Sequence, residues 1–506
     1  MPPTPFCPEC RSQEISWVEL SGQGTVYSYT VVSRAIFNGM EDCLPYVPAV
    51  VELADAGGVR LITNIVDAPI DAIAVDAPVT VVFDDLATGT SIPRFRLAPE
   101  RARNDPASGE TYANGKIAVM KPWAMWDVPF FDAAHRDFAH QLAQWPVPGA
   151  GTEPHDMATA ARALTAALSE RGLLDIVVPP GAESGKAKID VRAMCLAREV
   201  LSYSSVFADA IFAMQGIGTA AIWLFGSAEL REQYLPAARA GKTIAALAIS
   251  EPEAGSDVAA MTTSATRDGK DYVLSGRKTW ISNAGFADHY IVLARTVEAP
   301  GARGISAFLV DADTPGLRAG EPIDFIAPHP AASLQFDECR VPARRMIGAP
   351  GQGFKAAMAT LDLFRASVGA AALGAGRRAL DETLSRVTTR RMFGKTMAEM
   401  DGVQTRLADM LTDLEIAALA VYRAAWTKDV SGARCTREVS MSKLVATEAA
   451  QRIVDAAVQL FGGAGVERGG IIEQLYREVR PMRIYEGASE VHKLIIARDL
   501  IAARQT

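Results

Sequence analysis

The amino-acid sequence predicts a multidomain α+β protein in which a small β-barrel precedes a helical domain, a β domain and a second helical domain. A chain of 506 residues is too long for one hydrophobic core, and its length favours about two to four domains. The spacing of the apolar residues alternates along the chain between the period of strands and that of helices. Hydrophobic residues make up 49% and charged residues 22% of the chain, which is the composition of a globular protein.

The first predicted domain has the pattern of several short β-strands. Its apolar runs are rich in β-branched and aromatic residues and are separated by turn residues, as in a small barrel. We expect the strands at residues 24–32, 47–53, 59–66 and 79–83. A polar stretch that contains Gly and Pro follows them and predicts a linker.

From about residue 128 the apolar residues recur three and four positions apart, which indicates helices. We expect helices at residues 130–144 and 156–171. An apolar helical stretch at residues 191–225 is expected to break at Gly216 and Gly218.

A strand pattern returns in the next segment, and long helical patterns follow it to the C-terminus. The expected strands are residues 271–276, 289–294 and 305–310, and the expected helices are residues 354–389, 403–428 and 436–460. We therefore divide the chain into residues 1–104 (barrel), 105–125 (linker), 126–244 (helical domain), 245–345 (β domain) and 346–506 (C-terminal helical domain).

Composition and charge bound the possible functions. The chain has 51 Lys and Arg against 59 Asp and Glu, a net charge of −8 that does not favour a general nucleic-acid-binding protein. The first five residues lack the basic and apolar regions of a signal peptide, and we see no apolar run that approaches a membrane span. Six scattered cysteines do not form a secreted disulfide framework. We therefore expect a cytoplasmic protein without nucleic-acid or membrane partners.

Three motifs carry the functional signal. Residues 484–490 read Ile-Tyr-Glu-Gly-Ala-Ser-Glu, a carboxylate followed by a glycine that lets the backbone bend. Residues 250–257 and 276–283 are its upstream companions. At these residues the sequence resembles the acyl-CoA dehydrogenase family, over roughly residues 125–505. The resemblance implies a helical domain, a β-barrel-like middle domain and a C-terminal four-helix bundle.

The chemistry of a thioester sets what such a site must contain. Removal of its α-proton requires a positioned base and stabilisation of the enolate oxygen. Loss of the β-hydride requires an acceptor that no side chain supplies, so a cofactor is needed. A Gly-rich dinucleotide loop between a strand and a helix is missing, because residues 461–465 follow a long helical pattern instead. The resemblance implies FAD as the acceptor, Glu486 as the base and the Glu486 N–H as a donor to the thioester carbonyl.

The same resemblance assigns the remaining site residues. Trp280 would pack on the flavin ring, Ser282 would bond near its N5 atom, and the Arg390 guanidinium would pair with the pyrophosphate. In the family, residues 390–395 and 459–463 reach the FAD of a neighbouring subunit, which implies a homodimer or homotetramer. The implied FAD contacts are Leu247, Ile249, Ser250, Ser256, Trp280, Ser282, Arg390, Phe393, Gln459, Gly462, Gly463, Ala488 and Glu490, and the implied substrate contacts are Ser256, Arg365, Tyr485 and Gly487.

Structural interpretations of these residues stay open at this point. Trp280 can be a core aromatic of a β-sheet, Arg390 a solvated helix end, and Gly462 a helix C-cap. Arg365 can simply pair with Asp362 three residues earlier. Some members of the family carry the catalytic base at the position that Phe364 occupies in this chain. A phenylalanine side chain cannot act as a base.

Four departures from the family pattern are visible. Asp401 stands in place of a common Gln, Ala488 in place of a Thr, and Leu247 in place of an aromatic residue. Residues 326–332 replace a stretch that usually carries Gly and Arg. None of these changes removes the base, the stacking Trp or the pyrophosphate Arg.

The N-terminal domain resembles a second family, the acyl-CoA-associated OB-fold of the DUF35 type. The matching residues are 6–10, 22–28 and 92–96. Cys7 and Cys10 have the spacing of two zinc ligands, but a structural site needs four, so we assign no metal. The resemblance implies a role in acyl-CoA handling or protein docking.

The combined prediction is an FAD-dependent α,β-dehydrogenation of an acyl-CoA to a 2-enoyl-CoA, with hydride transfer to flavin N5 and an electron-transfer flavoprotein as acceptor. Glu486 favours dehydrogenation over the flavin monooxygenase chemistry of other proteins with this fold. The alternative is a scaffolding or acyl-CoA-binding partner of a thiolase or hydratase. The N-terminal domain suggests a bulky, cyclic or branched acyl group, from fatty, aromatic or alicyclic acid degradation.

Overall fold

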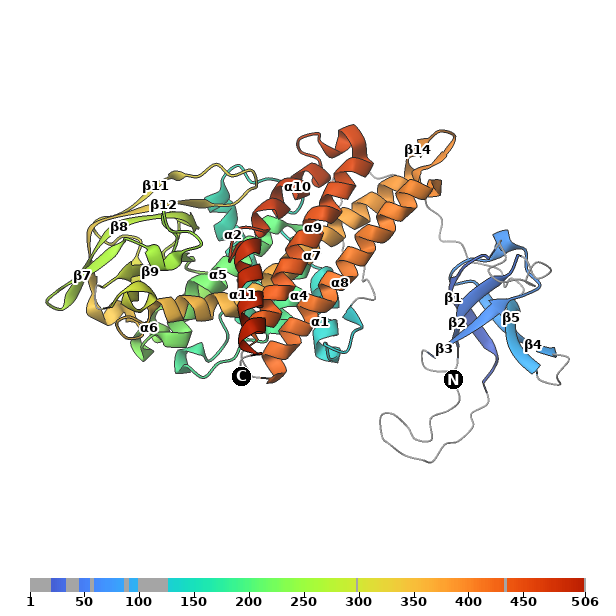
Figure 1. Cartoon of the computed structure of the whole chain (residues 1–506), viewed down its shortest axis with the longest axis horizontal. Helices are drawn as coiled ribbons and strands as arrows, with labels where there is room; N and C mark the ends of the chain where they lie inside the picture. Colours follow the sequence, from blue (N-terminus) through green and yellow to red (C-terminus); the bar gives the residue numbers. More distant parts are fainter. Residues whose placement is uncertain are drawn as a thin grey trace, which may run out of the picture. The chain divides into compact units, whose positions relative to one another are not determined.

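The computed structural model describes residues 20–32, 45–54, 59–85, 91–98, 126–296, 299–431 and 435–504. The chain forms two compact units, residues 1–112 and residues 113–506. Each unit is described by itself, and Figure 1 shows the elements of both.

The first unit is a closed five-stranded barrel with the strand order β1-β2-β3-β5-β4. Neighbouring strands are antiparallel except for the parallel pair β3 and β5. Val26, Val51, Val79 and Phe95 point inward and are buried. The predicted barrel is confirmed, whereas Cys7 and Cys10 lie outside the described residues. The strands are β1 (Gln23–Tyr29), β2 (Val47–Leu53), β3 (Arg60–Ile65), β4 (Pro78–Asp85) and β5 (Ser91–Leu97).

The second unit begins with a helical domain whose main helices start at side-chain caps. Asp132, Asp156, Asp190 and Ser205 each accept a hydrogen bond from a backbone N–H in the first turn of the helix that follows. Such caps satisfy donors that have no partner within the helix. The helices are α1 (Ala133–Ala143), α2 (Met157–Glu170), α3 (Leu174–Val177), α4 (Val191–Ser204), α5 (Val206–Phe225) and α6 (Ala228–Arg239).

The helix break expected at Gly216 and Gly218 is wrong. The chain breaks at Ser205, whose extended backbone and capping side chain start α5, and α5 continues through both glycines. A Cβ atom on Gly216 would lie 2.6 Å from the ring of Phe364, and one on Gly218 would lie 2.6 Å from the Cβ of Ala245. The two glycines therefore allow α7 and β6 to approach α5 closely.

The middle domain is a mostly antiparallel sheet of eight strands. The strand order is β11-β12-β8-β7-β9-β10-β13, and β6 pairs with β9 in parallel. Tyr272, Leu274, Phe308 and Phe336 are buried in its core. The strands are β6 (Ala245–Ala248), β7 (Ser264–Asp268), β8 (Asp271–Ser282), β9 (His289–Arg295), β10 (Ile305–Asp311), β11 (Leu317–Pro322), β12 (Ala331–Pro342) and β13 (Met346–Ile347).

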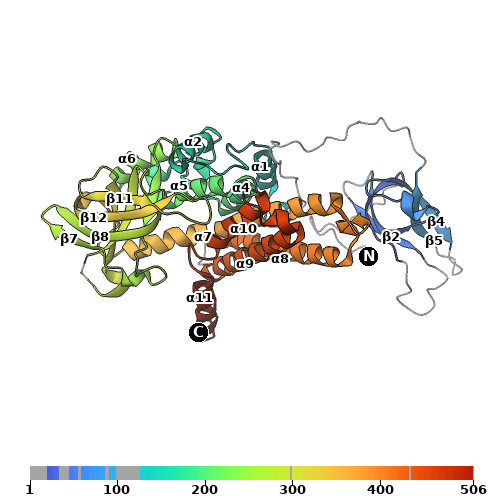
Figure 2. The ribbon, with the colours of Figure 1, turned by 90° about the horizontal axis from the view of Figure 1, so that it is seen from above.

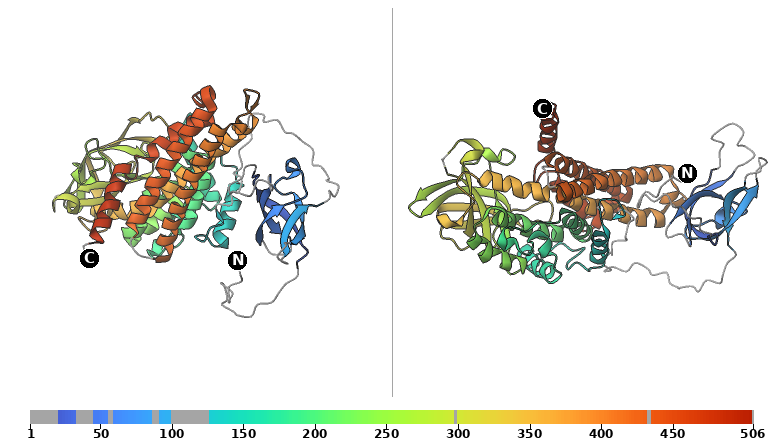
Figure 3. Two further views of the ribbon diagram at one scale, coloured as in Figure 1. Left: turned by 45° about the vertical axis from the view of Figure 1, so that its right-hand side comes forward. Right: turned by 90° about the horizontal axis from the view of Figure 1, so that it is seen from below.

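The C-terminal domain is a helical bundle built on three long helices. One end of α7 contacts β10 of the middle domain, and its other end leads into a small β-hairpin (Figure 1). Figures 2 and 3 show that α11 projects away from the bundle. The elements are α7 (Gly353–Thr389), β14 (Arg391–Met392), β15 (Lys395–Thr396), α8 (Asp401–Ser431), α9 (Thr436–Phe461), α10 (Ile471–Met482) and α11 (Ser489–Ala502).

Within the described part of the chain, α5 and α7 are long and apolar enough to cross a membrane by length and composition. The expectation that no apolar run approaches that length is therefore wrong. Most residues in the apolar stretch of each helix are buried inside the protein, as in the core helices of soluble proteins.

Candidate active site

Glu486 lies in a tight turn between α10 and α11. The backbone φ is +52° at Glu486 and +102° at Gly487, so both residues adopt left-handed conformations. This conformation is uncommon for a residue with a side chain and indicates local strain. A Cβ atom on Gly487 would lie 2.9 Å from Nε2 of His492, so the His492 ring would have to move to admit a side chain here.

Three hydrogen bonds hold this turn against α9. Glu448 accepts hydrogen bonds from Arg483 at 2.9 Å and from the Ser489 hydroxyl at 2.6 Å. Nζ of Lys443 donates a hydrogen bond to the Gly487 carbonyl at 2.7 Å. The turn is thus anchored before and after Glu486.

The carboxylate of Glu486 is buried and has no hydrogen-bond partner among the residues that the structure describes. Neither of its oxygens accepts a hydrogen bond from any residue that the structure describes. Burial raises the pKa of Glu486, while the charges of Arg198, Lys443 and Arg365 act in the opposite direction. Unsatisfied buried carboxylates are rare, and a raised pKa is typical of a group that exchanges protons with a ligand.

Two of these cations have carboxylate partners of their own. Arg198 on α4 donates two hydrogen bonds of 2.8 Å to Asp209 on α5. Arg365 forms an ion pair with Asp362, which confirms the structural interpretation of this residue. Phe364, the alternative base position, is buried.

Trp280 and Ser282 form a second part of the site at the end of β8. Trp280 has a φ of +61° and its side chain is 57% exposed, which contradicts the core interpretation. Oγ of Ser282 lies 2.7 Å from Nε2 of His329. Burial lowers the pKa of His329 to about 4, so this imidazole is neutral near pH 7.

A buried ion pair between Lys278 and Glu251 fixes the residues that follow β6. Nζ of Lys278 donates to the Glu251 carboxylate at 2.8 Å and to the Ile249 carbonyl at 2.9 Å. Burial opposes the ionisation of Glu251, but hydrogen bonds from Lys278 and from Thr262 lower the pKa of this carboxyl to about 2. Leu247, Ile249 and Ser250 are half-buried beside β8, and Ser256 lies in an exposed loop.

The residues predicted to contact the FAD of a neighbouring subunit lie near the C-terminal end of α7. Arg390 follows the last residue of α7 and is exposed, and Phe393 is 89% exposed. Gly462 is the C-cap of α9, so its structural interpretation is confirmed, and Gln459 is exposed beside it. At about 1.5 Å of rise per residue, Arg390 lies roughly 37 Å along α7 from Arg365. Within one chain, Arg390 is therefore remote from Arg365.

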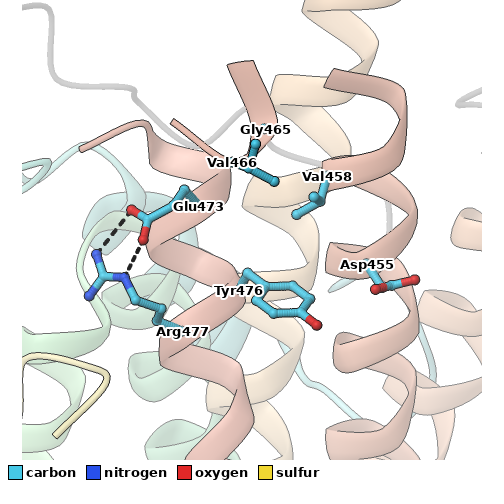
Figure 4. A pocket seen from close by; sticks show the side chains of 7 residues that line it. All are labelled: Asp455, Val458, Gly465, Val466, Glu473, Tyr476 and Arg477. Carbon is cyan, nitrogen blue, oxygen red and sulfur yellow. Dashed lines mark hydrogen bonds and ion pairs between the residues drawn. The ribbon is translucent and has the colours of Figure 1, made fainter. Parts of the chain in front are cut away.

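A surface depression lies elsewhere. Its volume is about 280 Å³, and it lies between the end of α9 and α10 (Figure 4). None of the predicted catalytic or cofactor residues lines it. The lining residues are Asp455, Val458, Gly465, Val466, Glu473, Tyr476 and Arg477.

Sequence reasoning missed Lys443, His492 and His329. Lys443 occupies the helical face that Val439, Ala446 and Ala450 share, and all are buried. That spacing of four, three and four could have revealed a buried lysine. His329 was visible only as part of an unusual segment, and the contact of His492 with the turn depends on tertiary structure.

Comparison with known protein families identifies the family to which this chain belongs. Residues 132–242, 246–339 and 351–501 match the N-terminal, middle and C-terminal domains of acyl-CoA dehydrogenases. Residues 17–84 match the family described as ChsH2, C-terminal OB-fold domain. The chain belongs to the acyl-CoA dehydrogenase family of oxidoreductases that act on CH–CH groups, and it carries an additional OB-fold domain at its N-terminus.

Individual relatives agree with this assignment. The chain is 39% identical to a probable acyl-CoA dehydrogenase of Mycobacterium leprae over 66% of this chain and 86% of the relative. It is 37% identical to cyclohexane-1-carbonyl-CoA dehydrogenase of Geobacter metallireducens over 66% of this chain and 88% of the relative. A solved structure described as PigA with FAD and proline superposes with a TM-score of 0.66 at 29% identity, over 73% of this chain and 98% of the other.

Proposed function

We propose that this chain is a cytoplasmic enzyme that removes one α-proton and one β-hydride from an acyl-CoA thioester and releases a 2-enoyl-CoA. The observation that carries the proposal is the Glu486 carboxylate, which is buried and unpartnered in a turn anchored on both sides. A base that must accept a proton from a ligand needs a free carboxylate, whereas a structural glutamate would have protein donors.

The residues around Glu486 support its role as the base. Its ionised carboxylate takes the α-proton, and the raised pKa makes it a stronger base than an exposed glutamate. The N–H of Glu486 makes no hydrogen bond within the described part of the chain. It is therefore available to the thioester carbonyl, where it would stabilise the enolate oxygen.

FAD fits the residues at the end of β8. An exposed indole at Trp280 offers an apolar face for a ring system, and Ser250 and Ser282 offer polar atoms beside it. Bound FAD supplies the acceptor for the β-hydride. Leu247, Ile249, Ser250, Trp280 and Ser282 would hold the flavin end.

We propose that a second copy of the chain holds the opposite end of the cofactor. The exposure of Arg390 and Phe393, beyond the end of α7 and roughly 37 Å along that helix from Arg365, supports this proposal. We therefore include a homodimer or homotetramer in the proposal, with each hairpin serving the neighbouring subunit. An electron-transfer flavoprotein as the electron acceptor belongs to the same proposal.

The test is anaerobic bleaching of the bound flavin by a panel of acyl-CoAs. We include straight-chain and alicyclic substrates because one relative is a cyclohexane-1-carbonyl-CoA dehydrogenase. Bleaching by the wild type, and not by Glu486→Gln, is the expected result. A yellow protein that no acyl-CoA bleaches would favour the scaffolding alternative. A protein unable to bind FAD would overturn the enzyme proposal.

A further inference from the structure

Lys443 is a buried cation without an ion-pair partner in the described part of the chain. It lies in α9 and is 0% exposed. Its Nζ donates to the Gly487 carbonyl at 2.7 Å, and it forms no ion pair with any residue that the structure describes. An isolated buried charge is costly, so its position needs an explanation. Burial lowers the pKa of Lys443 to about 8, whereas the nearby Glu486 carboxylate acts in the opposite direction.

Glu486 is the matching opposite charge. Its carboxylate is buried without a hydrogen-bond donor, while Arg198 is neutralised by Asp209 and Arg365 by Asp362. His492 does not compete as a cation, because burial lowers its pKa to about 3. Lys443 and Glu486 are thus two buried charges beside this turn that lack a dedicated ion-pair partner among the described residues, whereas Glu490, which also acts on Lys443, is exposed.

We propose that Lys443 is a positioning residue that holds the Gly487 carbonyl by hydrogen bonding and serves as the counter-charge of the Glu486 carboxylate. The proposal rests on the proposed function for the role of Glu486 as the base. The hydrogen bond fixes the peptide between Gly487 and Ala488, and the charge favours the ionised carboxylate before substrate binds.

Several helices contribute charged or titratable groups that face Glu486. Arg198 and Arg365 keep their carboxylate partners when Lys443 is changed, so their influence on Glu486 stays nearly constant. The groups are Arg198 from α4, Asp209 from α5, Arg365 from α7, Lys443 from α9, His492 from α11 and Tyr485 from the turn itself.

The test is an infrared titration of the Glu486 carboxyl group in the FAD-bound protein. The infrared band of a protonated carboxyl that is lost in Glu486→Gln belongs to Glu486. Each protein is therefore measured with and without the Glu486→Gln substitution, and the difference between the two spectra gives the Glu486 signal. Lys443→Gln keeps a donor but removes the charge, and Lys443→Arg keeps the charge. Lys493→Gln, at an exposed position of α11, is the matched control.

We expect Lys443→Gln to move the titration of Glu486 to higher pH by about one unit, since a nearby opposite charge lowers a carboxyl pKa by about that much or more. Lys443→Arg and Lys493→Gln are expected to titrate like the wild type. An unchanged titration in Lys443→Gln would overturn the proposal, as would equal shifts in the Gln and Arg variants. If Lys443→Gln does not fold, a full-unit shift in Lys443→Arg is the overturning result.

This readout is independent of turnover. If no acyl-CoA bleaches the wild-type flavin but the titration shifts as expected, the coupling of Lys443 to Glu486 stands and the dehydrogenation proposal falls. If the wild type is active, the acid limb of flavin reduction should move with the infrared titration. A loss of rate at every pH without a moved acid limb would show that Lys443 is only structural.

Discussion

The carboxylates of Glu199 and Glu486 are both buried, yet their surroundings are opposite. Glu199 accepts a hydrogen bond from the Tyr422 hydroxyl at 2.6 Å and forms an ion pair with Arg377, and all three residues are fully buried. Arg377 also donates to the Tyr422 hydroxyl at 2.8 Å, which closes the network. Glu486 has no such partner among the described residues. The charge of Glu199 is satisfied within the protein, whereas that of Glu486 is left for the catalytic role proposed above.

The comparison is tested most strongly at Glu486. We expect Glu486→Gln to lower the rate of anaerobic flavin reduction by roughly 10²- to 10⁴-fold, because a general base contributes about that much. Thermal stability should change little, because the substitution removes a buried carboxylate that has no donor but leaves Lys443 without its proposed counter-charge. Stopped-flow reduction and thermal unfolding measure the two effects. Glu232→Gln, on the exposed face of α6, is the control.

The reciprocal result is expected at Glu199. Glu199→Gln leaves the buried Arg377 guanidinium without its counter-charge, and breaking such a pair costs about 3–5 kcal/mol. We expect a much lower unfolding temperature, with flavin reduction per folded molecule close to that of the wild type. Arg452→Gln, which breaks the half-exposed pair with Asp413, should change stability by less than about 1 kcal/mol. Equal losses in the two variants would contradict the distinction.

The two glutamates also show what sequence reasoning can reach. Glu486 was assigned as the base because the residues of its turn and two upstream motifs resemble a known family, and the long helices α7, α8 and α9 were found because their apolar period persists. Glu199 lies in an ordinary helical pattern, and its partner Arg377 is distant in the sequence. The failed break at Gly216 has the same cause, because the ring of Phe364 that requires this glycine comes from another helix. Contacts between residues on different helices can be identified only from the three-dimensional structure.

The pH dependence separates the two roles further. Burial raises the pKa of Glu486. The rate of flavin reduction should therefore fall as pH drops through a value above the usual glutamate pKa of about 4.3. The pH dependence of the protein's stability has the opposite sign. A raised carboxyl pKa stabilises the fold below the unfolded-state pKa, and this contribution is lost as pH rises through the folded-state pKa.

The expected signature is a difference between wild type and Glu486→Gln that depends on pH. The wild type should become less stable relative to the variant as pH rises, and the acid limb of its activity should lie in the same range. Unfolding curves of both proteins across this range measure it. A stability difference that is constant with pH would show that the carboxyl group has an ordinary pKa.

The smallest expected effect concerns the geometry of the turn rather than its charge. Gly487→Ala places a Cβ atom 2.9 Å from Nε2 of His492 in a backbone with a φ of +102°. Strain of this kind costs about 1–3 kcal/mol, so stability should fall by that amount and flavin reduction should slow as Glu486 moves. Gly394→Ala, in the hairpin, has a φ of +82° and no atom within 4 Å of the added Cβ, so it isolates the backbone cost.

A double variant distinguishes the collision with His492 from the backbone cost at Gly487. His492→Ala removes the ring that the new Cβ would meet, so Gly487→Ala should cost less in that background than in the wild type. The two residues are in contact, and a coupling free energy of about 0.5–3 kcal/mol is expected for such pairs. Additive effects on unfolding would show that His492 yields readily and that the left-handed backbone alone requires the glycine beside the base.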